Sequence, residues 1–237
     1  MLPALTVLVT GGSGASGVAV AGALRAAGQR VIMVGSDQQR IEAAAQQAGD
    51  GVTPLTCDLA ILDDVRQLRD DVALHAGAVD AVIHLVGGWR GAQGIADQSD
   101  EDWDFLERGA VTTLRNITRV FFDDIAASPH GRFAMISSTA VERPEASVAN
   151  YVAAKAAAEA WTMAVADGFR RMAATGGGEA AAVVLVVKAL VDDGLRRSHP
   201  ERTFPGATDV AELAEAVVGL FDAPAAVLNG TRVRLAL

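Results

Sequence analysis

Basic residues are scarce in this sequence, and lysine occurs only twice. The 20 lysines and arginines are outnumbered by 29 aspartates and glutamates, which gives a formal net charge of −9. Nucleic acids and anionic membranes bind clustered Lys and Arg, so we expect neither as a partner. The single cysteine, Cys57, excludes an internal disulfide and leaves too few thiols for a structural zinc site, and no metal centre is expected.

Long apolar runs are also missing. The longest, residues 180–187, ends at Lys188 and is far shorter than the roughly 18 to 20 residues that cross a bilayer. No positively charged region precedes the first apolar run, so we expect no signal peptide and a cytoplasmic protein. No linker or repeat divides the 237 residues, which predicts a single domain over residues 1–237.

Short apolar runs alternate with longer amphipathic ones. The expected strands are residues 4–9, 30–35, 52–56, 79–86, 132–138, 181–188 and 231–236. The expected helices are residues 15–28, 38–48, 60–75, 101–127, 149–174 and 209–222. Strands that are apolar throughout are typical of parallel sheets buried on both faces. The pattern therefore predicts an α/β, Rossmann-type, doubly wound fold, with a seven-stranded parallel sheet flanked by helices on both faces.

A glycine-rich turn, TGGSGASG at residues 10–17, lies between the first strand and the first helix. Gly12, Gly14 and Gly17 match the pattern G-x-G-x-x-G, and the helix that follows directs its unpaired N–H groups at the turn. A strand before the turn and a helix after it favour a pyrophosphate-binding site over an ordinary tight turn.

In such a fold the ligand lies at the carboxyl ends of the strands. The second strand is followed by Gly35, Ser36 and Asp37. The absence of an acid at 35 or 36 favours a cofactor with a 2′-phosphate, whereas Asp37 suits a free ribose or a helix N-cap. Asp58, after the third strand, is equally suited to an adenine amino group and to capping the next helix.

Two residues that suit proton transfer lie one helical turn apart. Tyr151 is the only tyrosine and Lys155 is one of the two lysines, and their spacing places both on one helix face. A neighbouring ammonium favours the phenolate, so we expect Lys155 to lower the pKa of Tyr151. Ser138 ends an apolar strand at the same edge and is placed to hydrogen-bond a carbonyl oxygen. His84 also ends a strand, and a structural role fits it better than metal binding.

Together these features resemble the short-chain dehydrogenase/reductase family. The resemblance covers nearly the whole chain, and Tyr151-x-x-x-Lys155 with Ser138 upstream is its most specific part. It implies an NAD(P)-dependent oxidoreductase acting on a small carbonyl compound or secondary alcohol, with Tyr151, Ser138 and Lys155 as catalytic residues. The cofactor contacts it implies are Gly11, Ser13, Gly14, Ala15, Gly17, Ser36, Asp58, Leu59, Val86, Gly87, Tyr151 and Lys155. Between the two cofactors, the residues after the second strand favour NADP.

The sequence departs from the family pattern at several positions. The asparagine amides of the motif after the fourth strand are replaced by His84 and Leu85, and Ala110 stands where the family has a proton-relay asparagine. Asn116 lies six residues later and is no obvious substitute. Ala189 and Leu190 replace the usual Pro-Gly pair. These losses support an alternative in which the protein binds the cofactor as a sensor or partner subunit and has lost efficient chemistry.

Two expectations concern the rest of the chain. A short substrate lid is expected near residues 192–207, where His199 and Phe204 are candidates to contact the substrate. The apolar excess of the helices at 101–127 and 149–174, which pair across a twofold axis in the family, predicts a homodimer or homotetramer.

Overall fold

A parallel sheet of seven strands forms the centre of the molecule, for which the computed structural model describes residues 4–235. Its strand order is β3-β2-β1-β4-β5-β6-β9, and every neighbouring pair is parallel. The strands are β1 (Thr6–Thr10), β2 (Arg30–Gly35), β3 (Thr53–Thr56), β4 (Ala81–His84), β5 (Arg132–Ser138), β6 (Ala181–Val187) and β9 (Thr231–Arg234). Ala236, at the end of the last predicted strand, lies outside the described residues.

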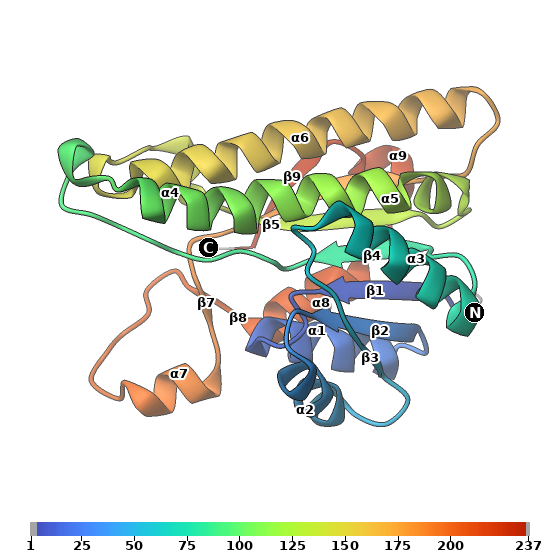
Figure 1. Ribbon diagram of the computed structural model, residues 1–237, viewed down its shortest axis with the longest axis horizontal. Helices are drawn as coiled ribbons and strands as arrows, with labels where there is room; N and C mark the ends of the chain where they lie inside the picture. The colour runs from blue at the N-terminus through green and yellow to red at the C-terminus, as the bar shows by residue number, and fades with distance from the viewer. Residues whose placement is uncertain (1–3, 236–237) are drawn as a thin grey trace.

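Helices cover both faces of this sheet (Figure 1). One layer contains α1 (Ala15–Ala26), α2 (Gln38–Ala48) and α8 (Val210–Gly219). The other contains α3 (Leu62–Ala76), α5 (Thr113–Ala127) and α6 (Ala149–Ala174). The predicted doubly wound fold is confirmed.

Two hydrophobic cores explain why the strands are apolar throughout. Leu8 of β1 joins the core under α3, α5 and α6, whereas Val7 and Val9 join the core under α1, α2 and α8. All three side chains are fully buried. Because successive side chains of a strand point to opposite faces, each central strand needs apolar residues at every position.

The predicted helix at 101–127 is interrupted. It consists of α4 (Asp100–Glu107), a π-helical segment (Arg108–Thr112) and α5. The Thr113 hydroxyl donates to the carbonyl of Gly109 at 2.7 Å within this segment. The segment has only five residues, too few for its wider i→i+5 turn to show in the apolar pattern of the sequence.

The region between β6 and α8 forms a lobe beside the sheet (Figure 1). Strands β7 (Leu190–Val191) and β8 (Thr208–Asp209) pair in parallel at its base, and α7 (Asp193–Ser198) lies between them. None of these elements was predicted, since they are too short for a periodic signal. A further short helix, α9 (Ala225–Leu228), precedes β9, and 3₁₀ turns occupy Ile95–Asp97, Thr139–Glu142 and Ala146–Val148.

Within residues 4–235, no helix has both the length and the apolar character that a membrane span requires. The same residues contain no group of three or more His, Cys, Asp or Glu side chains arranged to hold a metal ion. Cys57 is a buried free thiol, and burial together with nearby Asp64 raises its pKa to about 12.

Candidate active site and cofactor cleft

The turn after β1 depends on two of its glycines. Gly11 has a φ of +73°, and a Cβ there would lie 2.8 Å from the backbone carbon of Leu85. At Gly17 a Cβ would lie 2.4 Å from the carbonyl oxygen of Gly12. The first glycine lets the loops after β1 and β4 pass close together, and the second lets α1 approach the turn.

A cavity of about 540 Å³ opens at this point, along the carboxyl ends of β1, β2, β3 and β4. The strand order reverses between β1 and β4, which is where doubly wound sheets bind their ligands. Eight of the predicted cofactor-binding residues line the cavity: Gly11, Ser13, Gly14, Ser36, Asp58, Leu59, Val86 and Gly87. Ala15 and Gly17 belong to α1 and are not among its lining residues.

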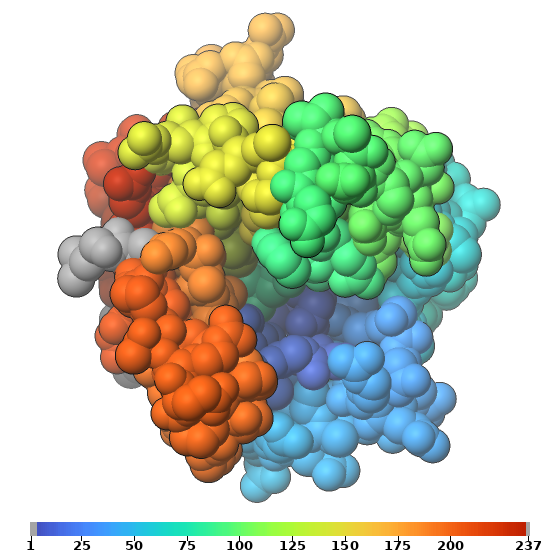
Figure 2. Space-filling view, turned by 90° about the vertical axis from the view of Figure 1, so that its left-hand side faces the viewer, coloured from blue at the N-terminus to red at the C-terminus, as the bar shows by residue number. Residues whose placement is uncertain are grey.

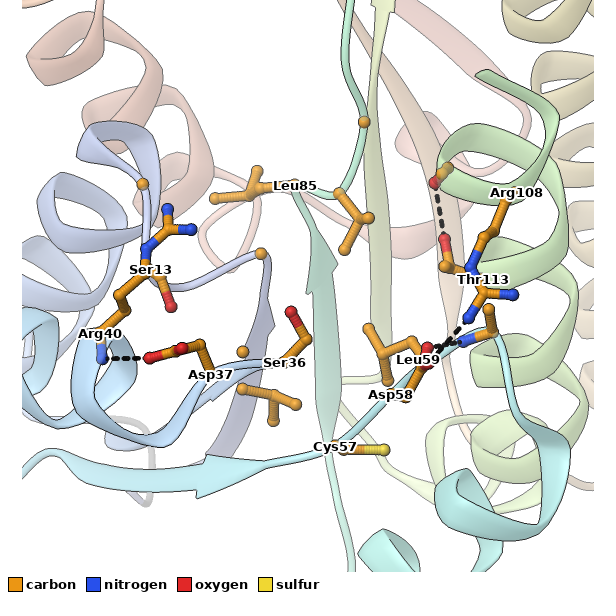
Figure 3. A pocket seen from close by; sticks show the side chains of 18 of the residues that line it. Ser13, Ser36, Asp37, Arg40, Cys57, Asp58, Leu59, Leu85, Arg108 and Thr113 are labelled. Atoms are coloured by element: carbon orange, nitrogen blue, oxygen red, sulfur yellow. Dashed lines mark hydrogen bonds and ion pairs between the residues drawn. The ribbon is translucent and has the colours of Figure 1, made fainter. Parts of the chain in front are cut away.

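Polar side chains occupy two opposite walls of this cavity. Ser13, Ser36 and Arg40 lie on one wall, and Asp58 and Arg108 lie on the other (Figure 3). The Arg108 guanidinium donates to an Asp58 carboxylate oxygen at 2.7 Å, which links the π-helical segment to the loop after β3.

The structure shows what the acids after β2 and β3 contact within the chain. Asp37 is the N-cap of α2, because its carboxylate accepts from the N–H of Arg40 at 2.8 Å, and it also lines the first cavity. Asp58 accepts from the N–H of Ala60 at 3.0 Å, so it organises the turn before α3, and it lines the cavity as well.

His84 is a structural residue, as its isolation in the sequence predicts. Its Nδ1 lies 2.8 Å from the Thr10 hydroxyl and its Nε2 lies 3.2 Å from the Thr113 hydroxyl. Thr113 already donates its proton to Gly109, so Nε2 is the donor and Nδ1 accepts from Thr10. Burial, helped by the charge of Lys155, lowers the pKa of His84 to about 3 and keeps the ring neutral.

A second cavity, of about 680 Å³, continues from the first. The two share Leu85, Val86 and Gly87, and together they form one cleft along the sheet edge. Tyr151 and Lys155 both line the second cavity. Figure 2 shows the cleft as a hollow whose floor is the N-terminal part of the chain, with the lobe of residues 190–207 at one side.

The Lys155 ammonium is buried between α6 and β5. Its Nζ donates to the carbonyl of Ile136 at 3.0 Å, and a Cβ at Gly87 would lie 3.1 Å from it. Burial lowers the pKa of Lys155 to about 8, although the Glu159 carboxylate one helical turn away opposes the shift. A large fraction of Lys155 is therefore charged at neutral pH.

The expectation that Lys155 lowers the pKa of Tyr151 is wrong for the protein as it stands. Burial of the phenol raises the pKa of Tyr151 above its usual value, and the Ser138 hydroxyl offsets only part of that effect. Tyr151 is therefore protonated at neutral pH.

The two serines at the end of β5 have different surroundings. The Ser138 hydroxyl oxygen accepts from the N–H of Ala140 at 3.2 Å, and the same hydroxyl forms the hydrogen bond that acts on the Tyr151 phenol. Ser138 is not among the lining residues of the second cavity. Ser137 lines the second cavity, and its hydroxyl donates to the buried Glu159 carboxylate at 2.5 Å. The opposite carboxylate oxygen of Glu159 pairs with Arg232 of β9 at 2.8 Å.

The structure also shows what surrounds the departures from the family pattern. Ala110 lies in the π-helical segment and packs with Ala154 and Tyr151. Asn116 donates to the carbonyl of Leu59 at 3.0 Å and is buried in α5, so its role is structural.

The sequence did not lead us to predict four basic residues of the cleft. Arg40 and Arg108 line the first cavity, and Lys188 and Arg202 line the second. Lys188 is the last residue of the predicted strand at 181–188, so its position was a usable signal, whereas Arg202 comes from an irregular loop. The candidates His199 and Phe204 are not among the cavity's lining residues; Phe204 instead lies under the Arg202 guanidinium at 5.4 Å.

Proteins of similar sequence are known. Nodulation protein G of Rhizobium meliloti is 30% identical over 149 residues, and this match covers 63% of the chain and 60% of that protein. Acetoacetyl-CoA reductase of Cupriavidus necator is 30% identical over 163 residues, which is 67% of the chain and 66% of that protein. The chain thus matches less than two thirds of the length of these relatives.

Solved structures share the fold over nearly the full chain. An NADPH-bound short chain oxidoreductase from Pseudomonas aeruginosa PAO1, with an atypical catalytic center, has a TM-score of 0.84 at 19% identity and covers 98% of this chain and 96% of its own. A gluconate 5-dehydrogenase from Burkholderia cenocepacia J2315, in complex with NADP and tartrate, has a TM-score of 0.83 at 22% identity, with coverage of 98% and 94%. The family model for short chain dehydrogenases matches residues 5–175, and this chain therefore belongs to the short-chain dehydrogenase/reductase family.

Proposed function

We propose that the protein is an NAD(P)-dependent oxidoreductase that interconverts a small carbonyl compound and the corresponding secondary alcohol. The observation that carries the proposal is the single cleft, in which the glycine turn opens one end and Tyr151 and Lys155 line the other. The relatives whose names describe reductases and dehydrogenases support it.

The residues of the cleft fit a dinucleotide. The N-cap of α1, Gly14, has no side chain of its own, and the N–H groups of the first helical turn favour a pyrophosphate. Gly11 and Gly14 leave the backbone open to close approach. When bound, the nicotinamide supplies or accepts the hydride, while the protein supplies position and electrostatics.

Each of the three catalytic side chains has a distinct role. The Tyr151 hydroxyl donates its proton to the carbonyl oxygen during reduction and takes it back during oxidation. Ser138, whose hydroxyl is paired with the Tyr151 phenol, donates a hydrogen bond to the same oxygen when the substrate is bound. Lys155 uses one N–H on Ile136, and its remaining N–H groups and its charge favour a ribose hydroxyl and the developing phenolate.

The substitution Tyr151→Phe tests this proposal. It keeps the ring that packs with Ala110 and Ala154 but removes the proton. We expect turnover of a carbonyl panel, followed by NADPH and NADH absorbance, to fall at least about a hundredfold. The cofactor Kd, measured by tryptophan fluorescence, should not change.

Full activity in the Tyr151→Phe variant would refute the assigned role of the phenol. Failure of the wild-type protein to bind either cofactor would refute the proposal as a whole. Tight binding without turnover of any carbonyl would instead favour the alternative, a cofactor-binding sensor or partner subunit, which the Ala110 substitution supports.

We further propose a preference for NADP. Ser36 and Arg40 share a wall of the first cavity, and a guanidinium beside a hydroxyl suits a 2′-phosphate. Asp37 uses one carboxylate oxygen to cap α2.

The substitution Arg40→Gln should raise the Kd for NADPH about tenfold and leave that for NADH unchanged. Arg66→Gln, on exposed α3, is the matched control, and equal weakening of both cofactors would contradict the preference.

A further inference from the structure

The charge of the second cavity is opposite to that of the whole chain. The protein carries a net charge of −9 and has only two lysines, yet both of them, Lys155 and Lys188, line this cavity together with Arg202. No aspartate or glutamate within residues 4–235 is among its lining residues. The proposed catalytic mechanism uses Lys155 and leaves the other two cations without a role.

Contacts with residues 190–207, which form the lobe, position both Lys188 and Arg202 in the second cavity. Lys188 directly follows β6, and its Nζ donates to the carbonyl of Pro205 at 2.8 Å. That bond uses one of three ammonium protons. Arg202 lies over the ring of Phe204. In Figure 2 the lobe of residues 190–207 stands directly beside the hollow.

Acidic groups of the same lobe are already occupied or lie outside the cavity. The Asp192 carboxylate accepts from the N–H of Leu195 at 2.6 Å and caps α7. Asp209 accepts from the N–H of Ala211 and pairs with Arg196 at 3.1 Å. The charges of Lys188 and Arg202 are therefore not neutralised by a carboxylate within ion-pair distance in the described part of the chain.

We infer that the second cavity takes a substrate that carries an anionic group, a carboxylate or a phosphate, bound by Lys188 and Arg202. This inference rests on the proposed function, since it places the reacting carbonyl at Tyr151. Trp89 and Leu190 supply apolar surface in the same cavity, which suits a carbon chain between the two polar ends.

A competing role for these cations is contact with the cofactor's own phosphates, because Ser16 of α1 also lines the cavity. Another is purely structural, since Lys188 holds the loop at Pro205. The experiment therefore has to distinguish three roles of these cations: binding the substrate, binding the cofactor's phosphates and holding the loop at Pro205.

The test measures equilibrium binding to the wild-type protein saturated with NADP⁺, by calorimetry. Two matched pairs are titrated: levulinate against methyl levulinate, and dihydroxyacetone phosphate against dihydroxyacetone. We expect at least one anion to bind about tenfold or more tightly than its neutral partner, the size expected for a charge-assisted hydrogen bond. The pair that discriminates identifies carboxylate or phosphate, and the difference should shrink with added salt.

Three variants of Lys188 test whether its charge causes the tighter binding of the anion. Lys188→Arg keeps the charge and should keep the discrimination. Lys188→Gln removes the charge but retains a donor for Pro205, and Lys188→Met removes both. We expect Gln and Met to abolish the discrimination equally, with the Kd for NADP⁺ unchanged.

Several outcomes would overturn the inference. One is that each anion binds with the same Kd as its neutral partner, or that neither binds detectably. Another is that Lys188→Gln discriminates between anion and neutral partner as the wild type does. A third is that the Lys188 variants lose affinity for NADP⁺ only. If neither NADP⁺ nor NAD⁺ binds the wild-type protein, the proposed function fails, and the same titrations of the free protein still decide whether the anion site exists.

Discussion

Lys155 illustrates how a single buried charge is controlled by residues that do not touch it. The closest helical neighbour of opposite charge, Glu159, lies one turn along α6 and shares its carboxylate with Ser137 and Arg232. Burial outweighs the opposing effect of the Glu159 carboxylate, and the pKa of Lys155 lies near 8. The ion pair between Glu159 and Arg232 of β9 connects the last strand of the sheet to the helix that carries Lys155.

A second buried group at the residue scale gives a pH prediction. The pKa of His84 is lowered to about 3 by burial, whereas an unfolded histidine titrates near about 6.5. Between these values the unfolded state binds the extra proton, so stability is present above about pH 6.5 and is lost as pH falls. We expect His84 to account for on the order of 3 kcal/mol of destabilisation between about pH 7 and pH 4.

Urea unfolding of the wild type and of His84→Gln at a series of pH values from about 7 to about 4 measures this contribution. Glutamine offers both a donor and an acceptor to Thr10 and Thr113 but has no proton to gain. The variant should lose less stability on acidification than the wild type does. His75→Gln, at an exposed position of α3, is the control and should follow the wild type. Parallel curves for all three proteins would rule out the role given to His84.

At the scale of elements, the glycines between β1 and α1 have two different roles. One is needed for the packing of the fold, and another is needed to leave space for the ligand. A Cβ at Gly17 would lie 2.4 Å from a backbone oxygen, whereas one at Gly14 would have its nearest neighbour 3.9 Å away. We expect Gly17→Ala to lower the free energy of unfolding by about 1–3 kcal/mol through overpacking.

Gly14→Ala should change the free energy of unfolding by less than about 1 kcal/mol, because the residue is the exposed N-cap of α1. It should nevertheless raise the cofactor Kd about tenfold or more, since the new methyl group enters the cavity that Gly14 lines. Thermal unfolding and fluorescence titration of both variants check the pair. A Gly14→Ala variant with unchanged cofactor affinity would place the pyrophosphate elsewhere.

At the scale of the whole molecule, α5 and α6 leave an apolar groove on the surface. It has a volume of about 430 Å³ and includes Phe122, Trp161 and Ala164. The two helices pack closely beneath it, where Phe122 stacks on Phe169 at 5.0 Å. Phe122 and Trp161 are half-buried there, and a groove of partly exposed apolar side chains suits a second copy related by a twofold axis, which is in line with the homo-oligomer predicted from the sequence.

Sedimentation of Ala164→Glu tests that oligomer. Ala164 is exposed in the groove, and a carboxylate there would be buried in the interface without a partner. We expect the wild type to be a dimer or tetramer and this variant to dissociate at least partly. Ala173→Glu, on an exposed part of α6 outside the groove, should assemble as the wild type does. A monomeric wild type would contradict the prediction.

The sequence by itself determined the order of the seven strands of the sheet and of the longer helices, and the position of the glycine turn. These are local features, since apolar periodicity and turn chemistry act over a few neighbouring residues. It also placed Tyr151 and Lys155 on one face of a helix, because that spacing follows from helix geometry alone.

Only the tertiary structure decided which of these residues share a cavity and what charge they carry there. The raised pKa of Tyr151, the lowered pKa of Lys155 and the entry of Arg40, Lys188 and Arg202 into the cleft depend on burial and on contacts between segments far apart in the sequence. Desolvation and long-range packing depend on the folded structure and produce no periodic pattern of residues, so neither could be predicted from the sequence.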